Sequence, residues 1–226
     1  MTNQALLIEL LTEELPPKAL QRLGDAFANS IEADLNKLSL LPTGYKSRSF
    51  ATPRRLAILI DQVLEQAPEQ DFVEKLMPAK VGLDADGNAT AALTKRLEAK
   101  GLGHLTAADL TKESDGKQDF LVARGKAPGA SLESSIQDII EHSISQLPIP
   151  KVMRYQLQDG QSSVRFVRPA HRLVTLYGDK VLAAEVLGLS SDRITEGHRF
   201  MGSSTLSLNH AEEYEQRLIN EGMVIA

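Results

Sequence analysis

A nearly continuous apolar run near the start of the chain constrains the fold most strongly. Residues 5–11 are apolar except for Glu9, and such a run predicts a mostly buried strand. The segment Thr12–Pro17 then predicts a helix start, because proline fits the first helical turn and carboxylates favour the positive end of the helix dipole. We expect this helix over residues 17–38, with an apolar face that comprises Leu20, Leu23, Phe27, Ile31, Leu35 and Leu38.

The remainder of the chain adds strands and a second long helix. Two short strands are expected over residues 45–50 and 55–63, separated by Thr52-Pro53. Further along, the patterns predict a helix over 131–147, strands near 163–167, 173–177 and 181–187, a helix over 211–221 and an apolar strand over 223–226. Without residues 64–128, the order is β-α-β-β-α-β, which is the ferredoxin-like order.

Residues 64–128 differ in character and are interpreted as an inserted subdomain. They predict a helix over 89–100, a capped short helix at 106–109 and a hairpin over 110–123 that turns at 114–116. We therefore predict an α+β fold, with mixed or antiparallel sheets, packed helices and a ferredoxin-like core. The domain boundaries are an N-terminal α+β region at 1–63, the insert at 64–128, and at 129–226 the return of the core and the start of a following domain. Because the sequence ends within an apolar run, we expect it to be cut from a longer protein.

Composition excludes several classes of protein. The 25 basic and 30 acidic residues give a net charge of −5, which excludes a wholly basic nucleic-acid coat but not a local basic patch. The absence of cysteine excludes disulfides, thiolate zinc sites and cysteine nucleophiles, and it fits a reducing compartment. The longest apolar runs have about five residues, against the ~20 that a membrane-spanning helix needs.

Motifs for catalysis are nearly absent. The sequence has no phosphate-binding GxxxxGK[ST] loop, no GxGxxG after a strand and no GxSxG elbow. Asp84 begins a segment that resembles a calcium loop, but Ala89 and Lys95 replace the required glycine and glutamate. Glu13 and Glu14 could be catalytic acids, although carboxylates at a helix start are commoner. No metal-ligand spacing links the five histidines, which are His104, His142, His171, His198 and His210. We therefore assign no catalytic and no metal-binding residue.

Two stretches of the chain concentrate positive charge. Residues 45–60 hold four basic residues and no acid, and residues 151–199 hold eight basic residues against five acids. Arginine pairs bidentately with phosphate, so such clustering is typical of contact with an RNA backbone. A solvated face with ordinary salt bridges explains the composition equally well. The candidate RNA-binding residues are Lys46, Arg48, Arg54, Arg55, Lys151, Arg154, Arg165, Arg168, Arg172 and Arg199.

The two basic stretches also resemble each other. Phe50-Ala-Thr-Pro-Arg-Arg55 matches Phe166-Val-Arg-Pro-Ala-His-Arg172 with one residue inserted, and an aliphatic strand follows each. In both, we expect the phenylalanine to be anchored in the core and the proline to end a strand. The arginines would then be exposed where the strand ends.

Five motifs carry a family resemblance. They are LTEELPPKAL at 11–20, FATPRRLA at 50–57, PKVMR at 150–154, FVRP at 166–169 and GHRF at 197–200. In this order and at this spacing, the chain from residue 6 onwards resembles the N-terminal part of the beta subunit of bacterial tetrameric glycyl-tRNA synthetase.

The resemblance implies an α2β2 enzyme in which the alpha subunit activates glycine with ATP and Mg²⁺ and the beta subunit binds tRNA-Gly. This region of the beta subunit is similar to the body and tail domains of archaeal CCA-adding enzymes, which bind tRNA. The resemblance thus implies a cytoplasmic segment that contributes tRNA binding and subunit assembly, holds no cofactor, does not catalyse alone and contacts neither DNA nor membrane. Two alternatives stay open: a scaffold that docks the alpha subunit without touching RNA, and a small independent enzyme.

Overall fold

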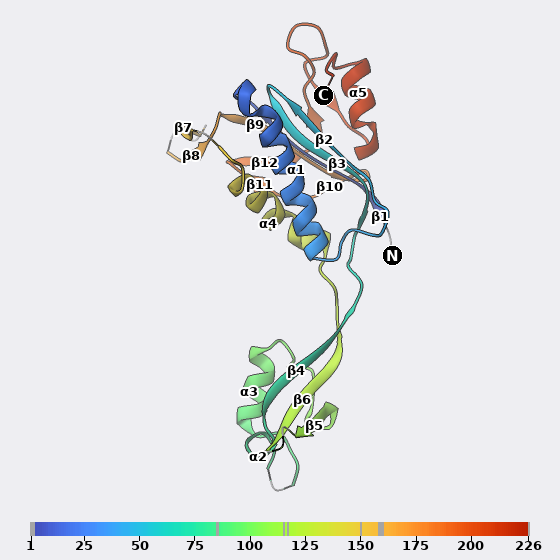
Figure 1. The fold of residues 1–226 in the computed structure, drawn as a ribbon, viewed down its shortest axis with the longest axis vertical. Helices are drawn as coiled ribbons and strands as arrows, with labels where there is room; N and C mark the ends of the chain where they lie inside the picture. Colours follow the sequence, from blue (N-terminus) through green and yellow to red (C-terminus); the bar gives the residue numbers. More distant parts are fainter. Residues whose placement is uncertain are drawn as a thin grey trace. The chain divides into compact units, whose positions relative to one another are not determined.

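The computed structural model describes residues 3–225 except for 85, 115, 117, 150 and 158–160. The chain divides into two compact units, which are described separately. The core unit comprises residues 1–67 and 130–226, and the insert unit comprises residues 68–129. Figure 1 shows the ribbon of both units. None of the described helices is both long and apolar enough to span a membrane.

The core unit contains a ferredoxin-like sheet, as predicted. Its four main strands lie in the order β9-β1-β3-β2, and each neighbouring pair is antiparallel. The α+β prediction is therefore confirmed. The elements of this βαββαβ core are β1 (Asn3–Thr12), α1 (Leu20–Lys37), β2 (Ser47–Thr52), β3 (Arg55–Leu64), α4 (Leu132–Ser145) and β9 (Ala170–Tyr177).

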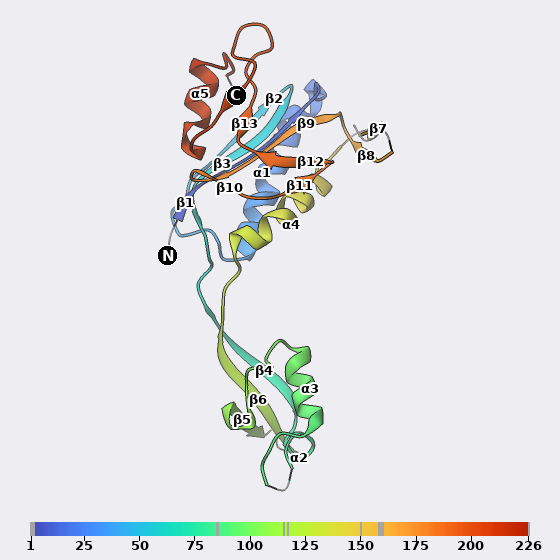
Figure 2. The ribbon, with the colours of Figure 1, turned by 180° about the vertical axis from the view of Figure 1, so that it is seen from behind.

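Both faces of this sheet are covered. Helices α1 and α4 pack on one face, where the side chains of Leu6, Ile8 and Leu10 from β1 are fully buried (Figure 1). The opposite face packs against the C-terminal segment (Figure 2). The side chain of Leu7 belongs to the buried cluster on that face. Because β1 is buried on both faces, it reads in the sequence as an apolar run rather than an alternation.

Short strands extend the sheet beyond β9, and here the sequence prediction is wrong in detail. The single strand expected over 181–187 is interrupted, because residues 182–184 lie outside regular structure, and Leu187 and Gly188, with positive φ values of 55° and 77°, then turn the chain into a further strand. The segment forms β10 (Lys180–Val181), β11 (Glu185–Val186) and β12 (Leu189–Asp192). Strand β12 pairs parallel to β9, and β11 forms the edge of the sheet beyond it.

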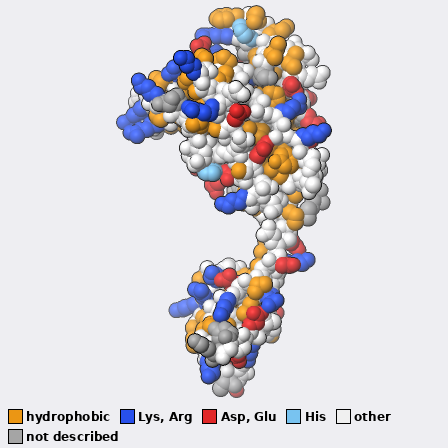
Figure 3. Space-filling view, in the orientation of Figure 1, with side chains coloured by type: hydrophobic (Ala, Val, Ile, Leu, Met, Phe, Trp, Pro, Cys, Tyr) orange, Lys and Arg blue, Asp and Glu red, His pale blue; other side chains and the backbone are white. Residues whose placement is uncertain are grey.

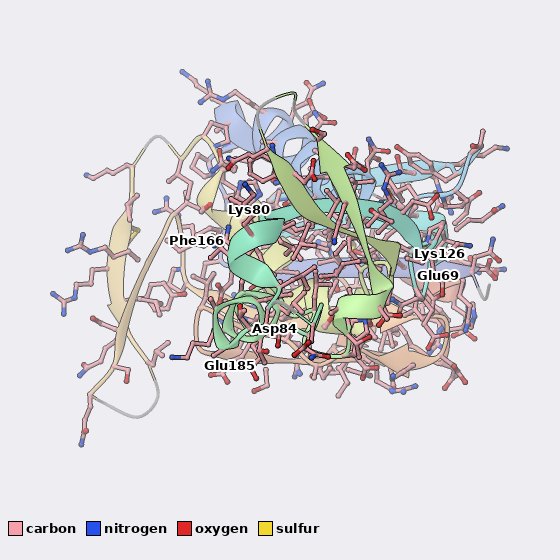
Figure 4. The ribbon with its side chains drawn as sticks, turned by 90° about the horizontal axis from the view of Figure 1, so that it is seen from below. Glu69, Lys80, Asp84, Lys126, Phe166 and Glu185 are labelled. Carbon is pink, nitrogen blue, oxygen red and sulfur yellow. The ribbon has the colours of Figure 1, made fainter. Side chains whose placement is uncertain are left out.

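A two-stranded ribbon precedes β9. It comprises β7 (Met153–Gln156), which the sequence did not predict, and β8 (Ser163–Phe166), which it did. Figure 4 shows this ribbon standing beside the rest of the core unit, with Phe166 labelled at its inner end. The buried Phe166 side chain anchors the ribbon in the main core, as the sequence predicted.

The C-terminal segment completes the core unit. Its elements are β13 (Ile194–Thr195), β14 (Leu206–Ser207), η3 (Ala211–Glu213) and α5 (Tyr214–Asn220). The apolar strand predicted over 223–226 is wrong for 223–225, which lie outside regular structure, since Met223 has a positive φ of 52° after Gly222. Residue 226 lies outside the described residues.

The insert unit has its own small core. Three antiparallel strands lie in the order β4-β6-β5, and Leu76, Leu93, Leu97 and Leu121 are buried between this sheet and the helices. The predicted hairpin and helices form, whereas β4 was missed. The elements are β4 (Gln70–Pro78), α2 (Ala79–Gly82), α3 (Ala91–Ala99), η2 (Ala107–Asp109), β5 (Leu110–Ser114) and β6 (Asp119–Ala127).

The loop that resembles a calcium site is a turn, as interpreted from the sequence. Asp84, labelled in Figure 4, accepts hydrogen bonds at its Oδ1 from the backbone N–H groups of Asp86 at 3.0 Å and Asn88 at 2.8 Å. These bonds, with that from Asn88 the strongest, lower the pKa of the Asp84 carboxyl. The carboxylate is thus used to hold the turn.

Candidate nucleic-acid interface

Three of the sequence motifs meet at one end of the sheet. The backbone N–H of Leu15 donates to the Pro53 carbonyl at 2.6 Å, and the N–H of Glu13 donates to the Pro169 carbonyl at 2.8 Å. The segment between β1 and α1 is therefore held between the β2–β3 turn and the segment that links β8 to β9. We call this region, residues 12–15, 53–54 and 168–171, the junction.

Two candidate arginines lie at the junction. The Arg168 Nε–H donates to the Glu14 carbonyl at 2.9 Å, and its Nη1 lies 3.0 Å from the sulfur of Met153 in the ribbon. The Arg54 guanidinium lies 3.9 Å from the Glu13 carboxylate. Both side chains are partly exposed. Arg54 and Arg168 come from the two different basic stretches. The fold places them next to each other, because Arg54 contacts Glu13 and Arg168 contacts Glu14.

Arg55 is the clearest correction to the sequence prediction. We expected it to be exposed, but its side chain is only 3% exposed, and its Nη1 lies 3.2 Å from the fully buried Glu9 carboxylate. Glu9 and Arg55 lie on the same face of neighbouring strands, which turns both toward the C-terminal segment rather than solvent. Arg55 therefore cannot reach an RNA phosphate in this structure.

The buried Glu9 also binds the C-terminal segment. The Tyr214 hydroxyl donates to Glu9 Oε1 at 2.6 Å. Burial raises the pKa of the Glu9 carboxyl, and the Arg55 charge opposes this effect. Sequence reasoning missed this pair, although a single carboxylate inside an apolar strand was a signal, since a buried charge needs a partner.

Arg172 is also compensated by carboxylates. Its Nη1 lies 3.3 Å from Asp192, and its Nε lies 3.1 Å from Glu196. Its side chain is 31% exposed, so the exposure expected for it where the strand ends is only partial. Arg172 ties β9 to the strands that follow it, which is the salt-bridge alternative that the sequence left open.

The basic residues of the first stretch lie at opposite ends of β2. Arg48 pairs with Glu215 of α5, and Lys46 is exposed beside it. In the β2–β3 pairing, Ser47 lies opposite Ile60, whereas Thr52 lies opposite Arg55 next to the junction. Lys46 is thus about 20 Å along the strand from the junction, at ~3.3 Å per residue. Lys46 and Arg48 do not join the other candidates.

The ribbon carries the most unusual arrangement of charge. Arg154 and Arg165 lie directly opposite each other in the β7–β8 pairing, and both side chains are exposed. The Arg154 Nε–H donates to Ser163 Oγ at 2.8 Å. Within the described ranges, neither arginine pairs with a carboxylate. Lys151, exposed just before β7, adds a third cation, and Figure 3 shows Lys and Arg side chains gathered over this part of the surface.

A hollow continues from the junction. It has a volume of about 400 Å³, and its lining includes Glu14, Arg54, His198, Arg199 and Phe200. Arg199 is exposed. The ribbon, the junction and this hollow therefore form one connected region of the core unit, which we call the basic track. It contains six of the ten candidates: Arg54, Lys151, Arg154, Arg165, Arg168 and Arg199.

His142 and His171 each contact a carboxylate. His171 Nε2 lies 2.9 Å from Glu13 Oε1, and His142 Nδ1 lies 2.6 Å from Asp34. Among the residues that the structure describes, no group of three or more His, Cys, Asp or Glu could hold a metal ion. Glu13 contacts Arg54 and His171 across the junction. Neither the 3-10 helix Pro17–Ala19 nor α1 has an acidic residue in its first turn, so Glu13 does not have the helix-start role that the sequence favoured.

Fold and surface thus define an α+β protein with a ferredoxin-like core, an insert unit and a basic track. A family model described as glycyl-tRNA synthetase beta subunit matches residues 6–226, and the chain belongs to this family. It is 46% identical, over its whole length, to the glycine–tRNA ligase beta subunit of Janthinobacterium sp. (strain Marseille). It is 47% identical, again over its whole length, to that of Acidovorax ebreus (strain TPSY). In both comparisons the chain spans 32% of the relative.

Proposed function

We propose that the basic track binds the sugar–phosphate backbone of tRNA-Gly, as part of a glycine–tRNA ligase. The observation that carries this proposal is the cross-strand pair of exposed arginines, Arg154 and Arg165, on the ribbon. The names of the relatives indicate tRNA as the nucleic acid.

The energetics of the ribbon favour a functional interpretation of these arginines. Like charges placed directly opposite each other destabilise a pair of antiparallel strands. A neutral or oppositely charged pair at Arg154 and Arg165 would stabilise the ribbon, and a bound anion would have the same effect. Guanidinium groups bind phosphate oxygens bidentately, and phosphates along one strand present negative charges in a row. Lys151 and Arg168 extend the positive charge toward the junction.

Charge reversal on the ribbon tests the proposal. We expect Arg154→Glu/Arg165→Glu to weaken binding of a tRNA-Gly transcript at least tenfold at low salt, because two phosphate contacts are lost and two repulsions are added. The matched control is Lys37→Glu/Lys180→Glu, which makes the same charge change at exposed sites on α1 and β10. Filter binding measures both. Equal affinities for the two variants would refute a role for the ribbon.

A second candidate function is docking of the alpha subunit. The relatives are beta subunits, and two apolar side chains of the insert unit are exposed, Val73 at 61% and Val81 at 56%. If the insert unit docks the alpha subunit, co-purification should be lost in Val73→Asp/Val81→Asp and kept in the ribbon variant. The opposite pattern would assign docking to the ribbon.

The rest of the proposal concerns the whole enzyme. We place glycine activation, ATP and Mg²⁺ in the alpha subunit of an α2β2 assembly in the cytoplasm, and we assign no catalytic step to this chain alone. The assay is glycine-dependent exchange between ATP and pyrophosphate. Glycine-dependent ATP–pyrophosphate exchange by the isolated chain would contradict the assignment of glycine activation to the alpha subunit.

A further inference from the structure

One loop of the core unit is firmly held but presents apolar side chains to solvent. Residues 197–203 form a loop whose two ends are held to the core unit by backbone hydrogen bonds. The N–H of Gly197 donates to the Ser203 carbonyl at 3.0 Å, and the N–H of His198 donates to the Gly222 carbonyl at 2.6 Å. The base of the loop is thus fixed against the segment that follows α5.

Glycines make this close approach possible. A Cβ on Gly197 would lie 2.5 Å from the Ser203 carbonyl oxygen and 2.7 Å from the Cα of Gly222. A Cβ on Gly202 would likewise collide with the backbone of Gly222. Larger residues at these positions would force the two backbones apart, so the glycines fix the position of the loop tip.

The tip carries an aromatic ring that is almost fully exposed. Phe200 is 84% exposed and Met201 is 67% exposed. The Phe200 N–H donates to His198 Nδ1 at 3.2 Å, and the Arg199 guanidinium carbon lies 5.8 Å from the centre of the Phe200 ring. Phe200 lines the same hollow as the exposed Met223 and Ile225, and exposed apolar side chains gathered in one patch indicate a surface that acquires a partner.

The hollow of about 400 Å³ lies beside this ring. Three cations, Arg54, Arg55 and Arg199, line it together with a single carboxylate, Glu14. Arg55 is already paired with the buried Glu9, and the apolar side chains of Met223 and Ile225 form part of the wall. Its size falls within the range of small-ligand sites. Cations therefore exceed anions around a cavity that also offers an aromatic face.

We propose that this hollow holds one unpaired nucleotide of the RNA that the basic track binds. The base stacks on Phe200, and Arg54 and Arg199 contact the adjoining phosphate. Stacking on an aromatic side chain next to basic groups is the usual way to hold a single-stranded base without reading its sequence. This inference rests on the proposed function and adds that the RNA must have an unpaired segment near the junction.

Charge complementarity favours a nucleotide over an apolar segment of a protein. A protein segment that covers Phe200 and Ile225 would bring two arginines out of water: Arg54, whose nearest carboxylate, Glu13, is 3.9 Å away, and Arg199. A nucleotide supplies both the apolar face and the compensating charge.

A tryptophan reporter tests the inference directly. The chain contains no tryptophan, so Phe200→Trp introduces one fluorophore that can still stack. We expect its fluorescence to be quenched by an RNA hairpin with a four-nucleotide unpaired 3′ extension and not by the blunt hairpin. The control is Ile219→Trp, on the exposed side of α5, which should respond to neither RNA.

Affinity measurements separate this inference from the proposed function. Phe200→Ala should weaken binding of the extended hairpin about tenfold and leave the blunt hairpin unaffected, whereas Arg154→Glu/Arg165→Glu should weaken both. If the ribbon variant weakens both RNAs but Phe200→Ala weakens neither, the nucleotide site is refuted and the proposed function stands. If the unaltered chain binds neither RNA, both proposals fail. If Phe200→Ala abolishes co-purification with the alpha subunit and leaves RNA binding unchanged, the surface is a protein interface and the inference is wrong.

Discussion

At the scale of single residues, the decisive contact is the buried pair of Glu9 and Arg55. The β1–β3 register places Arg55 opposite Leu11, two residues from Glu9 on the same face. The two residues are far apart in the sequence, and charge counts cannot show that one arginine of the pair Arg54-Arg55 is buried while its neighbour is partly exposed. Arg54 lies in the β2–β3 turn and Arg55 is the first residue of β3, and only the pairing of β1 with β3 shows that Arg55 shares a face with Glu9.

Removing Arg55 should destabilise the chain strongly. Arg55→Ala leaves a fully buried carboxylate without its cation, and we expect a loss of about 3–5 kcal/mol in the free energy of unfolding. Arg54→Ala is the matched control at the next position, where the ion pair is long and partly exposed, and it should cost below about 1 kcal/mol. Urea denaturation measures both. Equal losses would show that the buried pair contributes little.

The buried carboxyl should also make stability depend on pH. Burial raises the pKa of Glu9 above its ordinary value of 4.5, so the folded chain holds this proton to higher pH than the unfolded chain. The stabilising contribution is complete below pH 4.5 and decreases as the pH rises through the raised pKa. The stability of the unaltered chain relative to Glu9→Gln should therefore fall as the pH rises above 4.5. A relative stability that instead rises with pH in urea denaturation would show that the Arg55 charge outweighs burial.

At the scale of elements, the packing of α1 on β2 depends on one glycine. A Cβ on Gly24 would lie 2.7 Å from the Cβ of Ala51. Alanine normally stabilises a helix interior by about 1 kcal/mol relative to glycine, but here Gly24→Ala should destabilise the chain.

A compensating variant tests the contact between α1 and β2. Gly24→Ala/Ala51→Gly restores the space, so it should recover most of the thermal stability that Gly24→Ala loses. A double-mutant cycle isolates this coupling from the intrinsic helix propensity. Additive effects of the two substitutions would mean that the backbones move apart instead.

Elements with long periodic patterns were predictable from the sequence, whereas short ones were not. The apolar run of β1 and the apolar stripes of α1 and α4 have enough residues to define their period. Strand β7 has four residues, of which only Tyr155 is partly buried, so its pattern carries no signal. Strand β4 was missed because only Leu76 of its nine residues is buried, so the segment shows no apolar run.

At the scale of the whole molecule, the insert unit should be separable. The backbone N–H of Ala67 donates to the Ala130 carbonyl at 2.9 Å, and Gln66 and Ser131 form an antiparallel bridge. The two segments of the core unit that flank the insert are thus already paired like the strands of a hairpin. Replacing residues 68–129 with Asn-Gly, a favoured hairpin turn, should leave the core unit folded with one cooperative unfolding transition. Loss of that transition in circular dichroism would show that the core unit depends on the insert.

The candidate site was predictable only in outline. The sequence identified which stretches are basic, and the fold brings six of the ten residues into the basic track. It could not distinguish Arg154, which faces solvent, from Arg172, which Asp192 and Glu196 compensate, because that difference depends on strands paired at the sheet edge. The GHRF motif marked Phe200 in the sequence but did not predict its exposure, since a lone phenylalanine usually marks a core position.

The central claim is that the ribbon arginines contact RNA phosphates, and the salt dependence of tRNA-Gly binding tests it most directly. Each phosphate contact releases condensed counterions and adds about one unit to the slope of log K against log salt. The slope of Arg154→Glu/Arg165→Glu should therefore be shallower than that of the unaltered chain by about two, while Lys37→Glu/Lys180→Glu keeps the original slope. Parallel lines for the ribbon variant and the unaltered chain would contradict the account.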